Sequence, residues 1–281
     1  MKRLIVSADD FGLTKTINQG IAGACRDGIV TSVNLIPTGE AFADAVRLMK
    51  DLGLGEAGAH LAFTETSPLA GARGIRTLIT LDGRFHKNRN LFLLRFLAGR
   101  IDLDELYREL KSQMDVIAMA GLRITDLSSH EHLHMIPAVL DIFIKLAKEY
   151  DVPAIRFPHS DWSALTGMEA AYRRIILAFF EKGVGSSLRA AGMIFPDHFR
   201  GLLDSGRMTE EALLAAIRSL DEGTTELVCH PGLLGPEVRE RYGFHMNCET
   251  ELSALTSARV KELLRERDIT LIRYGEFLSD R

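Results

Sequence analysis

Three histidines within five residues are the most unusual chemical feature of this sequence. His130, His132 and His134 alternate with Glu131 and Leu133. In an extended segment, a spacing of two places all three imidazoles on one face. Imidazole is a good ligand for Zn²⁺ and other borderline divalent metals. The motif therefore predicts a metal or acid–base site that uses at least one of these histidines, and a solvated histidine patch is the alternative interpretation.

Two adjacent carboxylates near the amino terminus, Asp9 and Asp10, supply a second chemical group. They follow the short apolar segment 3–8, which has the composition of a buried strand. Neighbouring side chains of a continuing strand point to opposite sides, but a turn at the strand end brings both toward one centre. One carboxylate can then hold a metal while the other accepts a proton. The alternative is a turn or capping pair, because aspartate favours such positions.

Three further polar residues lie in or directly after short apolar segments. His60 by itself is more typical of a protein core, and only its position near the end of an expected strand favours a site. Arg156 is as consistent with a buried ion pair as with a clamp on a substrate carboxylate. His230, which precedes Pro231-Gly232, is an acid or base candidate. Cys229 is expected in the core. The remaining histidines are expected in surface loops: His86, His159, His198 and His245.

A regular alternation of strands and helices would position these residues. Strands are expected at 3–8, 30–36, 58–63, 124–129, 154–157, 192–195, 226–230 and 269–273. Helices are expected at 14–28, 41–52, 90–98, 102–120, 137–150, 169–182, 209–220 and 250–267, with a long loop at 64–88. This rhythm predicts βαβ units and a parallel sheet. A single-domain α/β chain with a (β/α) barrel fits best, and a doubly wound open sheet is the alternative. In a barrel, the carboxyl ends of the strands carry the active site.

The composition excludes several classes of protein. The chain has 281 residues, 46% hydrophobic, with 34 basic and 38 acidic side chains and a net charge of −4. This balance is typical of a soluble globular protein and argues against a nucleic-acid partner. The three scattered cysteines fit a reducing compartment. No signal peptide or membrane-spanning segment is evident, so a cytoplasmic location is expected. No Gly-x-Gly-x-x-Gly motif follows the first expected strand, and a P-loop is absent.

Four motifs, taken in order, resemble those of the YdjC/ChbG carbohydrate deacetylases. They are Ser7-Ala-Asp-Asp-Phe-Gly-Leu13, Gly58-Ala-His-Leu61, Ser129-His-Glu-His-Leu-His134 and Glu226-Leu-Val-Cys-His-Pro-Gly232. The resemblance runs from residue 3 to about residue 275. It implies one domain over residues 1–281 and a distorted, TIM-like βα barrel related to polysaccharide deacetylases. It also implies a divalent metal ion and hydrolysis of the N-acetyl group of an amino sugar.

The resemblance also implies roles for particular residues. Asp10, His60 and His130 match the metal ligands, Asp9 the catalytic base and His230 the general acid. The ion is expected to be Mg²⁺ or Zn²⁺, with Mn²⁺ or Co²⁺ as alternatives. Further residues are expected at the substrate or around the ligands: His132, His134, Arg156, Phe11 and Asp126.

The histidine motif departs from the family pattern at two positions. Diacetylchitobiose deacetylases have Asp where this chain has Ser128, and His where it has Glu131. If that Asp orients a metal histidine, Asp126 is a candidate replacement, because it lies two residues earlier on the same strand face.

Within the family, the chain most resembles the hopanoid-associated HpnK branch, which implies a lipid-linked N-acetylglucosamine substrate. Residues 89–100 are apolar and flanked by arginines, and residues 175–180 are also apolar. Such helices fit the core or a homodimer interface, and the alternative is peripheral contact with the inner membrane surface. Two other functions stay open: a different metal-dependent barrel enzyme (a sugar isomerase or an amidohydrolase), and a sugar-binding protein without activity.

Overall fold

A curled parallel sheet forms the centre of the computed structural model, which describes residues 1–159, 183–202 and 204–281. The strands are β1 (Lys2–Phe11), β2 (Ser32–Leu35), β3 (Glu56–Leu61), β4 (Arg123–Ser129), β5 (Ala154–Ile155), β6 (His198–Arg200), β7 (Gly223–Cys229) and β8 (Ile269–Leu271). They are ordered β5-β4-β3-β2-β1-β7-β6, and β8 also pairs with β1. The predicted helix at 169–182 and the apolar segment at 175–180 lie outside the described residues.

One short segment links the two edges of this sheet. Ile194 forms a parallel bridge with Ala154 in β5, and its backbone N–H donates to the carbonyl of Pro153 at 2.9 Å. Four residues later the same segment enters β6, which pairs with β7. The chain therefore curls into a distorted barrel, which confirms the predicted α/β fold class over the doubly wound alternative.

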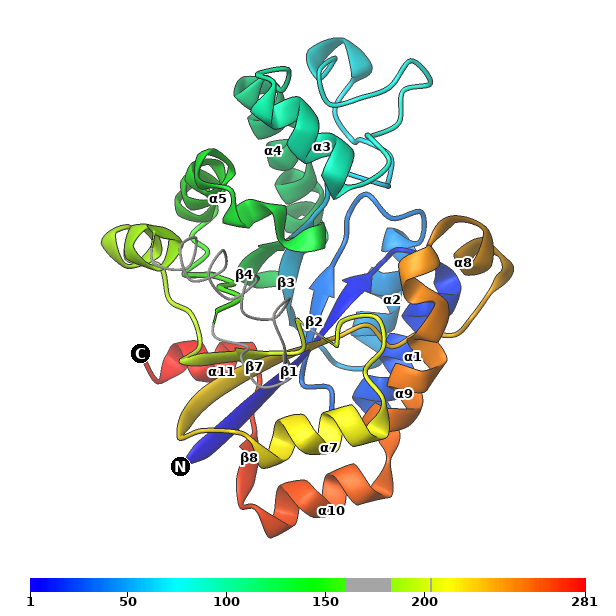
Figure 1. Ribbon diagram of the computed structural model, residues 1–281, viewed down its shortest axis with the longest axis vertical. Coiled ribbons are helices and arrows are strands. Elements are labelled where there is room, and N and C mark those ends of the chain that lie inside the picture. Colours follow the sequence, from blue (N-terminus) through cyan, green and yellow to red (C-terminus); the bar gives the residue numbers. More distant parts are fainter. Residues whose placement is uncertain (160–182, 203) are drawn as a thin grey trace, which may run out of the picture.

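Helices lie around the outside of the sheet (Figure 1). They are α1 (Lys15–Asp27), α2 (Phe42–Asp51), α3 (Arg89–Leu97), α4 (Leu103–Met119), α5 (Pro137–Glu149), α7 (Glu210–Arg218), α8 (Pro236–Arg241), α9 (Cys248–Thr256), α10 (Ala258–Glu266) and α11 (Tyr274–Ser279). In α1, the hydroxyl of Thr14 caps the first turn by accepting from the N–H of Ile17, and Ile17 and Ile21 pack into the core.

The single helix predicted at 250–267 is in fact two helices. Ser257 has an extended backbone between α9 and α10, and its hydroxyl accepts from the N–H of Arg259. A serine side chain that satisfies a free backbone N–H favours a new helix start over continuation. The helix boundary predicted there was therefore wrong.

Helix α11 closes the amino-terminal end of the barrel. The N–H of Tyr274 donates to Ser32 at the start of β2, and the N–H of Gly275 donates to Glu56 at the start of β3. Tyr274 and Phe277 pack with Ile5 into a small apolar cluster at this end. The carboxyl ends of the strands are left to form a site. Among the described helices, none combines the length and the apolar character needed to cross a membrane.

Candidate active site

The last residues of β1 turn two adjacent carboxylates toward the same centre. Asp10 has a positive φ of 65°, which breaks the alternation of an extended strand. Gly12 has a φ of 117°, and a Cβ there would lie 2.8 Å from the carbonyl oxygen of Ile36. Only glycine suits that backbone. The predicted turn at the strand end is therefore present, and His60 lies 3.9 Å from Asp9 and 3.5 Å from Asp10.

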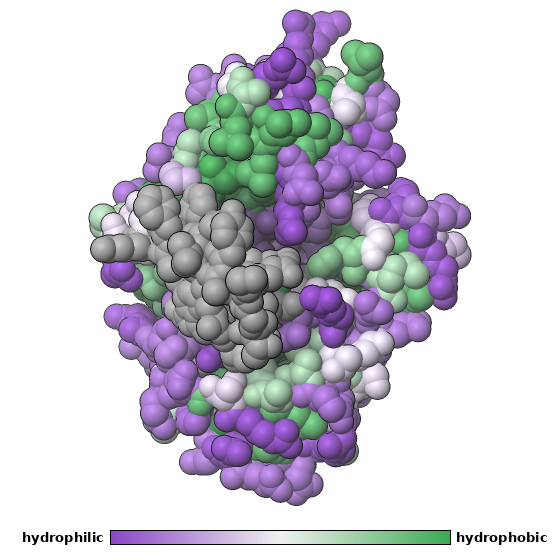
Figure 2. All heavy atoms as spheres, viewed as in Figure 1, coloured by the Kyte–Doolittle hydropathy of each residue, from purple (hydrophilic) through white to green (hydrophobic). Residues whose placement is uncertain are grey.

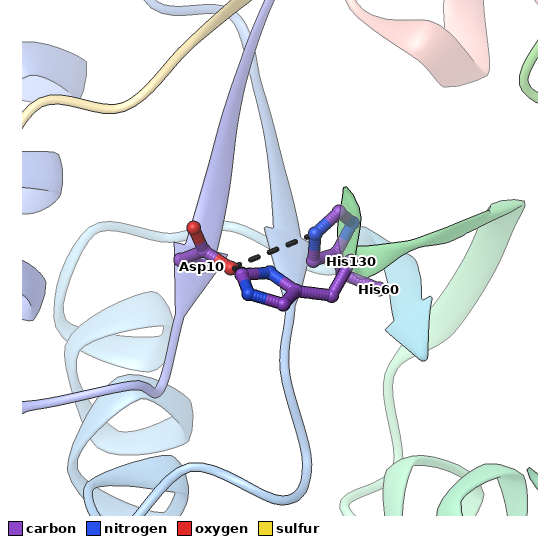
Figure 3. A group of neighbouring side chains, drawn as sticks. All are labelled: Asp10, His60 and His130. Atoms are coloured by element: carbon purple, nitrogen blue, oxygen red, sulfur yellow. Dashed lines mark hydrogen bonds and ion pairs between the residues drawn. The ribbon is translucent and has the colours of Figure 1, made fainter. Parts of the chain in front are cut away.

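Asp10, His60 and His130 form a buried group that could hold a metal ion. Their ligand atoms all lie within 4.8 Å of one another. They come from the end of β1, from β3 and from the residue after β4, and the three side chains point toward one another (Figure 3). Two imidazoles and one carboxylate make a donor set that suits Zn²⁺ and tolerates harder divalent ions.

Each of these two histidines has one nitrogen toward Asp10 and its other nitrogen held by a neighbour. The Nδ1 atom of His60 bonds the Ser128 hydroxyl at 2.9 Å. The Nδ1 atom of His130 lies 3.1 Å from Asp10, and its Nε2 atom lies 3.2 Å from Glu65. Outer partners of this kind fix the tautomer and the ring orientation of metal-ligating histidines. Burial alone would lower the pKa of His130, but Asp10 and Glu65 raise it well above its ordinary value. The residues present fit a bound cation.

Replacement of Ser128 by alanine is expected to weaken metal binding about 10–100-fold, because the Nδ1 atom of His60 loses its partner. Competition with a coloured chelator would measure the affinity of the metal-free protein for Zn²⁺. Ser129→Ala is the matched control, because the Ser129 hydroxyl bonds the Nδ1 atom of His134 instead. Equal Zn²⁺ affinity in the wild type and Ser128→Ala would contradict the role of Ser128.

The three clustered histidines do not share one face, because the segment is not extended. Residues His130–Met135 form a short 3₁₀ turn, in which Glu131 and His132 have positive φ. His134 points inward and bonds the carbonyl of Arg156 at 2.9 Å. Burial lowers the pKa of His134 to about 3, so this ring stays neutral. His132 lies on the wall of the neighbouring cavity.

Arg156 lies beneath the site as the partner of two buried carboxylates. Its Nη1 and Nη2 atoms donate to the two oxygens of Asp9 at 2.6 and 2.9 Å, and its Nε atom donates to Glu226 at 2.9 Å. Asn34 donates to Asp9 at 2.7 Å. Burial alone would raise the pKa of Asp9, but Arg156 and then His60 bring it well below its ordinary value. Of the two interpretations of Arg156, the buried ion pair is the one observed.

Asp126 faces the interior of the barrel. Its Oδ1 atom accepts from the Thr125 hydroxyl at 2.8 Å, and its Oδ2 atom has no partner among the described residues. Burial and the charge of Glu226 raise the pKa of Asp126 to about 7. Asp126 was expected as a candidate to replace the family aspartate that orients a metal histidine. The Nδ1 atom of His60 bonds the hydroxyl of Ser128 instead, so Ser128 orients this ring.

Asp126→Asn is expected to gain stability relative to the wild type as the pH rises from about 4 to about 7. Over this range the unfolded chain loses the carboxyl proton while the folded protein keeps it, so wild-type stability falls. Each pKa unit corresponds to about 1.4 kcal/mol, so the gain reaches at most roughly 4 kcal/mol. Urea unfolding of both proteins at pH 5 and pH 8 would measure it. If the difference in the free energy of unfolding between Asp126→Asn and the wild type does not grow with pH, the raised pKa of Asp126 is contradicted.

His230 follows β7 and faces the same space. Its backbone N–H donates to Glu251 at 2.6 Å, its Nε2 atom lies 3.9 Å from Asp9, and its ring meets the Phe244 ring edge-on at 4.9 Å. Burial lowers its pKa. Phe11, by contrast, is completely buried in the hydrophobic core, and it does not line the cavity.

A cavity of about 420 Å³ lies over these residues. Asp9, His60, His130 and His230 line it, together with polar residues of the surrounding loops and the ring of Phe244. A second cavity of similar volume lies at the amino-terminal end of the sheet, beside Glu56 and Tyr274. No histidine from the described part of the chain lines that second cavity. The ligand-type chemistry is therefore at the carboxyl end of the barrel.

Two of the histidines expected in surface loops are buried. His245 is 2% exposed, and its Nε2 atom lies 2.9 Å from Asp10. His86 is 4% exposed and bonds the carbonyl of Thr77. His245 belongs to a 3₁₀ turn rather than to a strand end, so the strand-end criterion could not find it. Cys229 is in the core as expected.

The fold and the site together define an α/β-barrel protein with a candidate metal centre at the carboxyl end of its strands. Residues 3–266 match the model of the YdjC-like protein family, and the chain belongs to this family. The HpnK branch is a finer assignment than this match supports.

Relatives and a solved structure cover nearly all of the chain. A carbohydrate deacetylase of Brevibacillus brevis is 32% identical over 98% of this chain and 99% of its own length. A carbohydrate deacetylase of Vibrio cholerae is 30% identical over 99% and 97%. A proposed cellobiose-phosphate cleavage protein of Enterococcus faecalis V583 has a TM-score of 0.79 and 26% identity, with 98% of each chain covered. The chain thus has carbohydrate deacetylase homologues over its full length.

Proposed function

We propose that this chain removes the N-acetyl group from an N-acetylated amino sugar and releases acetate, and that residues 1–281 act as one domain. The observation that carries the proposal is the buried Asp10, His60 and His130 group beside Asp9 and His230. Full-length homology to carbohydrate deacetylases supports the choice of substrate class.

The reaction forms a bond from water oxygen to the acetyl carbon and breaks the C–N bond. When bound, a divalent ion (Zn²⁺ or Mg²⁺, with Mn²⁺ or Co²⁺ as alternatives) supplies Lewis acidity for the poorly electrophilic carbonyl. Asp9 would accept the proton of the attacking water, because its lowered pKa keeps it ionised at neutral pH. His230, 3.9 Å from Asp9, would take this proton from Asp9 and pass it to the departing amine, which is otherwise a poor leaving group. The products are acetate and the free amino sugar.

The wall of the cavity fits a carbohydrate. It combines charged and amide side chains, among them Glu131, Asn88 and Arg207, with the aromatic ring of Phe244. Sugars present hydroxyls to polar groups and C–H faces to aromatic rings. We propose a glycoside of the N-acetylglucosamine type as the acetylated substrate.

A lipid-linked substrate, such as a hopanoid glycoside, is the finer form of this proposal. Arg89 at the start of α3 lines the cavity, and Leu94 and Leu97 of the same helix are 66% and 82% exposed. Figure 2 shows apolar side chains gathered on this face of the molecule. Leucines flanked by arginines favour contact with an anionic lipid surface at the inner membrane. Sedimentation with anionic vesicles tests this part, and equal sedimentation of the wild type and Leu94→Gln/Leu97→Gln would overturn it.

Acetate release across a panel of soluble and lipid-linked N-acetylamino sugars, with and without a chelator, tests the main proposal. We expect release from at least one glycoside, loss with the chelator and recovery with added ion. Turnover of a sugar without acetate release would favour the alternative of another metal-dependent barrel enzyme. Chelator-resistant sugar binding without turnover would favour a sugar-binding protein. Either result would overturn the proposed deacetylase activity.

A further inference from the structure

His245 contacts a different oxygen of the Asp10 carboxylate from the one that His60 and His130 approach most closely. Its Nε2 atom lies 2.9 Å from Oδ2 of Asp10, whereas His60 and His130 approach Oδ1 at 3.5 and 3.1 Å. The two oxygens of Asp10 are therefore divided between two sets of partners. His245 does not belong to the group of ligand atoms within 4.8 Å of one another.

The chemistry of this contact defines the direction of the hydrogen bond. An ionised carboxylate can only accept, so the Nε2 atom of His245 must carry the proton and donate. The contact is fully enclosed, since His245 is 2% exposed and Asp10 is 1% exposed. In such surroundings a hydrogen bond to a charged group is stronger than one in water.

The surrounding turn holds the His245 ring in place. Its backbone N–H donates to the carbonyl of Tyr242 at 2.9 Å. Asn247, two residues later, donates to the carbonyl of Gly206 at 3.0 Å. The preceding residue, Phe244, meets the His230 ring on the cavity wall. One short turn thus contacts both the ligand carboxylate and the proposed general acid.

We propose that His245 is a positioning residue: it holds Oδ2 of Asp10 and leaves Oδ1 to face the ion. This proposal rests on the proposed metal site. With Oδ2 engaged, the carboxylate presents one oxygen together with His60 and His130. Without His245, the carboxylate can rotate and offer both oxygens.

Zn²⁺ binding to the metal-free protein tests the proposal without any measurement of turnover. His245→Phe keeps a ring but removes the donor, and is expected to bind Zn²⁺ about 10–100-fold more weakly. His245→Gln places an amide N–H near the position of Nε2 and is expected to recover most of the affinity. His198→Phe is the control, because that imidazole lies outside the site and bonds the carbonyl of Glu222, and its Zn²⁺ affinity should equal that of the wild type.

Co²⁺ absorption supplies a readout that a merely structural role would not change. The visible bands of bound Co²⁺ weaken as its coordination number rises, so His245→Phe is expected to show weaker bands than the wild type at full occupancy. If His245→Phe does not fold, His245→Asn takes its place, because its amide is too short to reach Oδ2.

Wild-type Zn²⁺ affinity and Co²⁺ bands in His245→Phe would overturn the positioning role. An equal loss of Zn²⁺ affinity in His245→Phe and His245→Gln would overturn it as well, because the N–H donor to Asp10 would then not matter. Both results would leave acetate release by the wild type untouched, so failure here is distinct from failure of the proposed deacetylase.

Discussion

Asp9→Asn is expected to lower kcat by about 10²–10⁴-fold while leaving the bound metal in place. The amide cannot accept the proton of the attacking water, and acid–base assistance typically contributes this range. Asp9 is not one of the three grouped ligand residues, so metal content should persist. Acetate release and metal analysis on the same preparation would measure the two effects separately. Full activity in Asp9→Asn would show that Asp9 is not the base.

A matched control separates the loss of the base from disturbance of Arg156. Glu226→Gln also removes a carboxylate that bonds Arg156, but Glu226 is completely buried and does not line the cavity. We expect Glu226→Gln to retain most of the activity. If it lost as much activity as Asp9→Asn, the effect would come from the displaced arginine, and the base would have to be sought elsewhere.

Arg156→Met is expected to destabilise the protein by about 3–5 kcal/mol. The substitution leaves the carboxylates of Asp9 and Glu226 buried without their shared cation, and breaking a buried ion pair from one side has a cost of this order. Urea unfolding at neutral pH would measure the loss. A loss below about 1 kcal/mol, typical of an exposed pair, would contradict the central place of Arg156 in the fold.

The same substitution should make stability more dependent on pH. Arg156 is the largest of the charges that lower the pKa of Asp9, so without it burial is expected to raise this pKa above its ordinary value. The folded variant then keeps a proton that the unfolded chain loses as the pH rises above about 4. The deficit relative to the wild type is therefore larger at pH 8 than at pH 5. Arg156→Lys is the control: it keeps the charge but cannot bond both oxygens of Asp9 and Glu226 together.

The residues of the candidate metal group were visible in the sequence as candidates because they lie at strand ends, and the family resemblance then implied their role as ligands. A polar residue that ends an apolar segment is visible in a single sequence, and parallel strands bring such ends to one edge. Asp10, His60 and His130 met both conditions, and the structure brings them together. The barrel was also predictable, because the alternation of strands and helices follows from hydrophobic periodicity, which is a local property of the sequence.

The course of the chain after β4 was not predictable in this way. The alternation of His130, His132 and His134 is equally compatible with an extended segment and with a turn. Positive φ at Glu131 and His132 selects the turn, and it sends the three rings in different directions. The family resemblance pointed to His130 as the ligand, but the spacing of the motif did not.

The sequence by itself therefore determined which strand ends carry the chemistry and that a parallel barrel would gather them. Only the tertiary structure decided which groups hold these residues in place. Arg156 bonds Asp9 across 147 residues, and His245 bonds Asp10 across 235 residues. Such contacts depend on the closure of the barrel and on the path of loops without periodicity. Local sequence patterns predict neither the closure of the barrel nor the path of these loops. They reflect burial against neighbouring elements and not the distant partner that a buried charge requires.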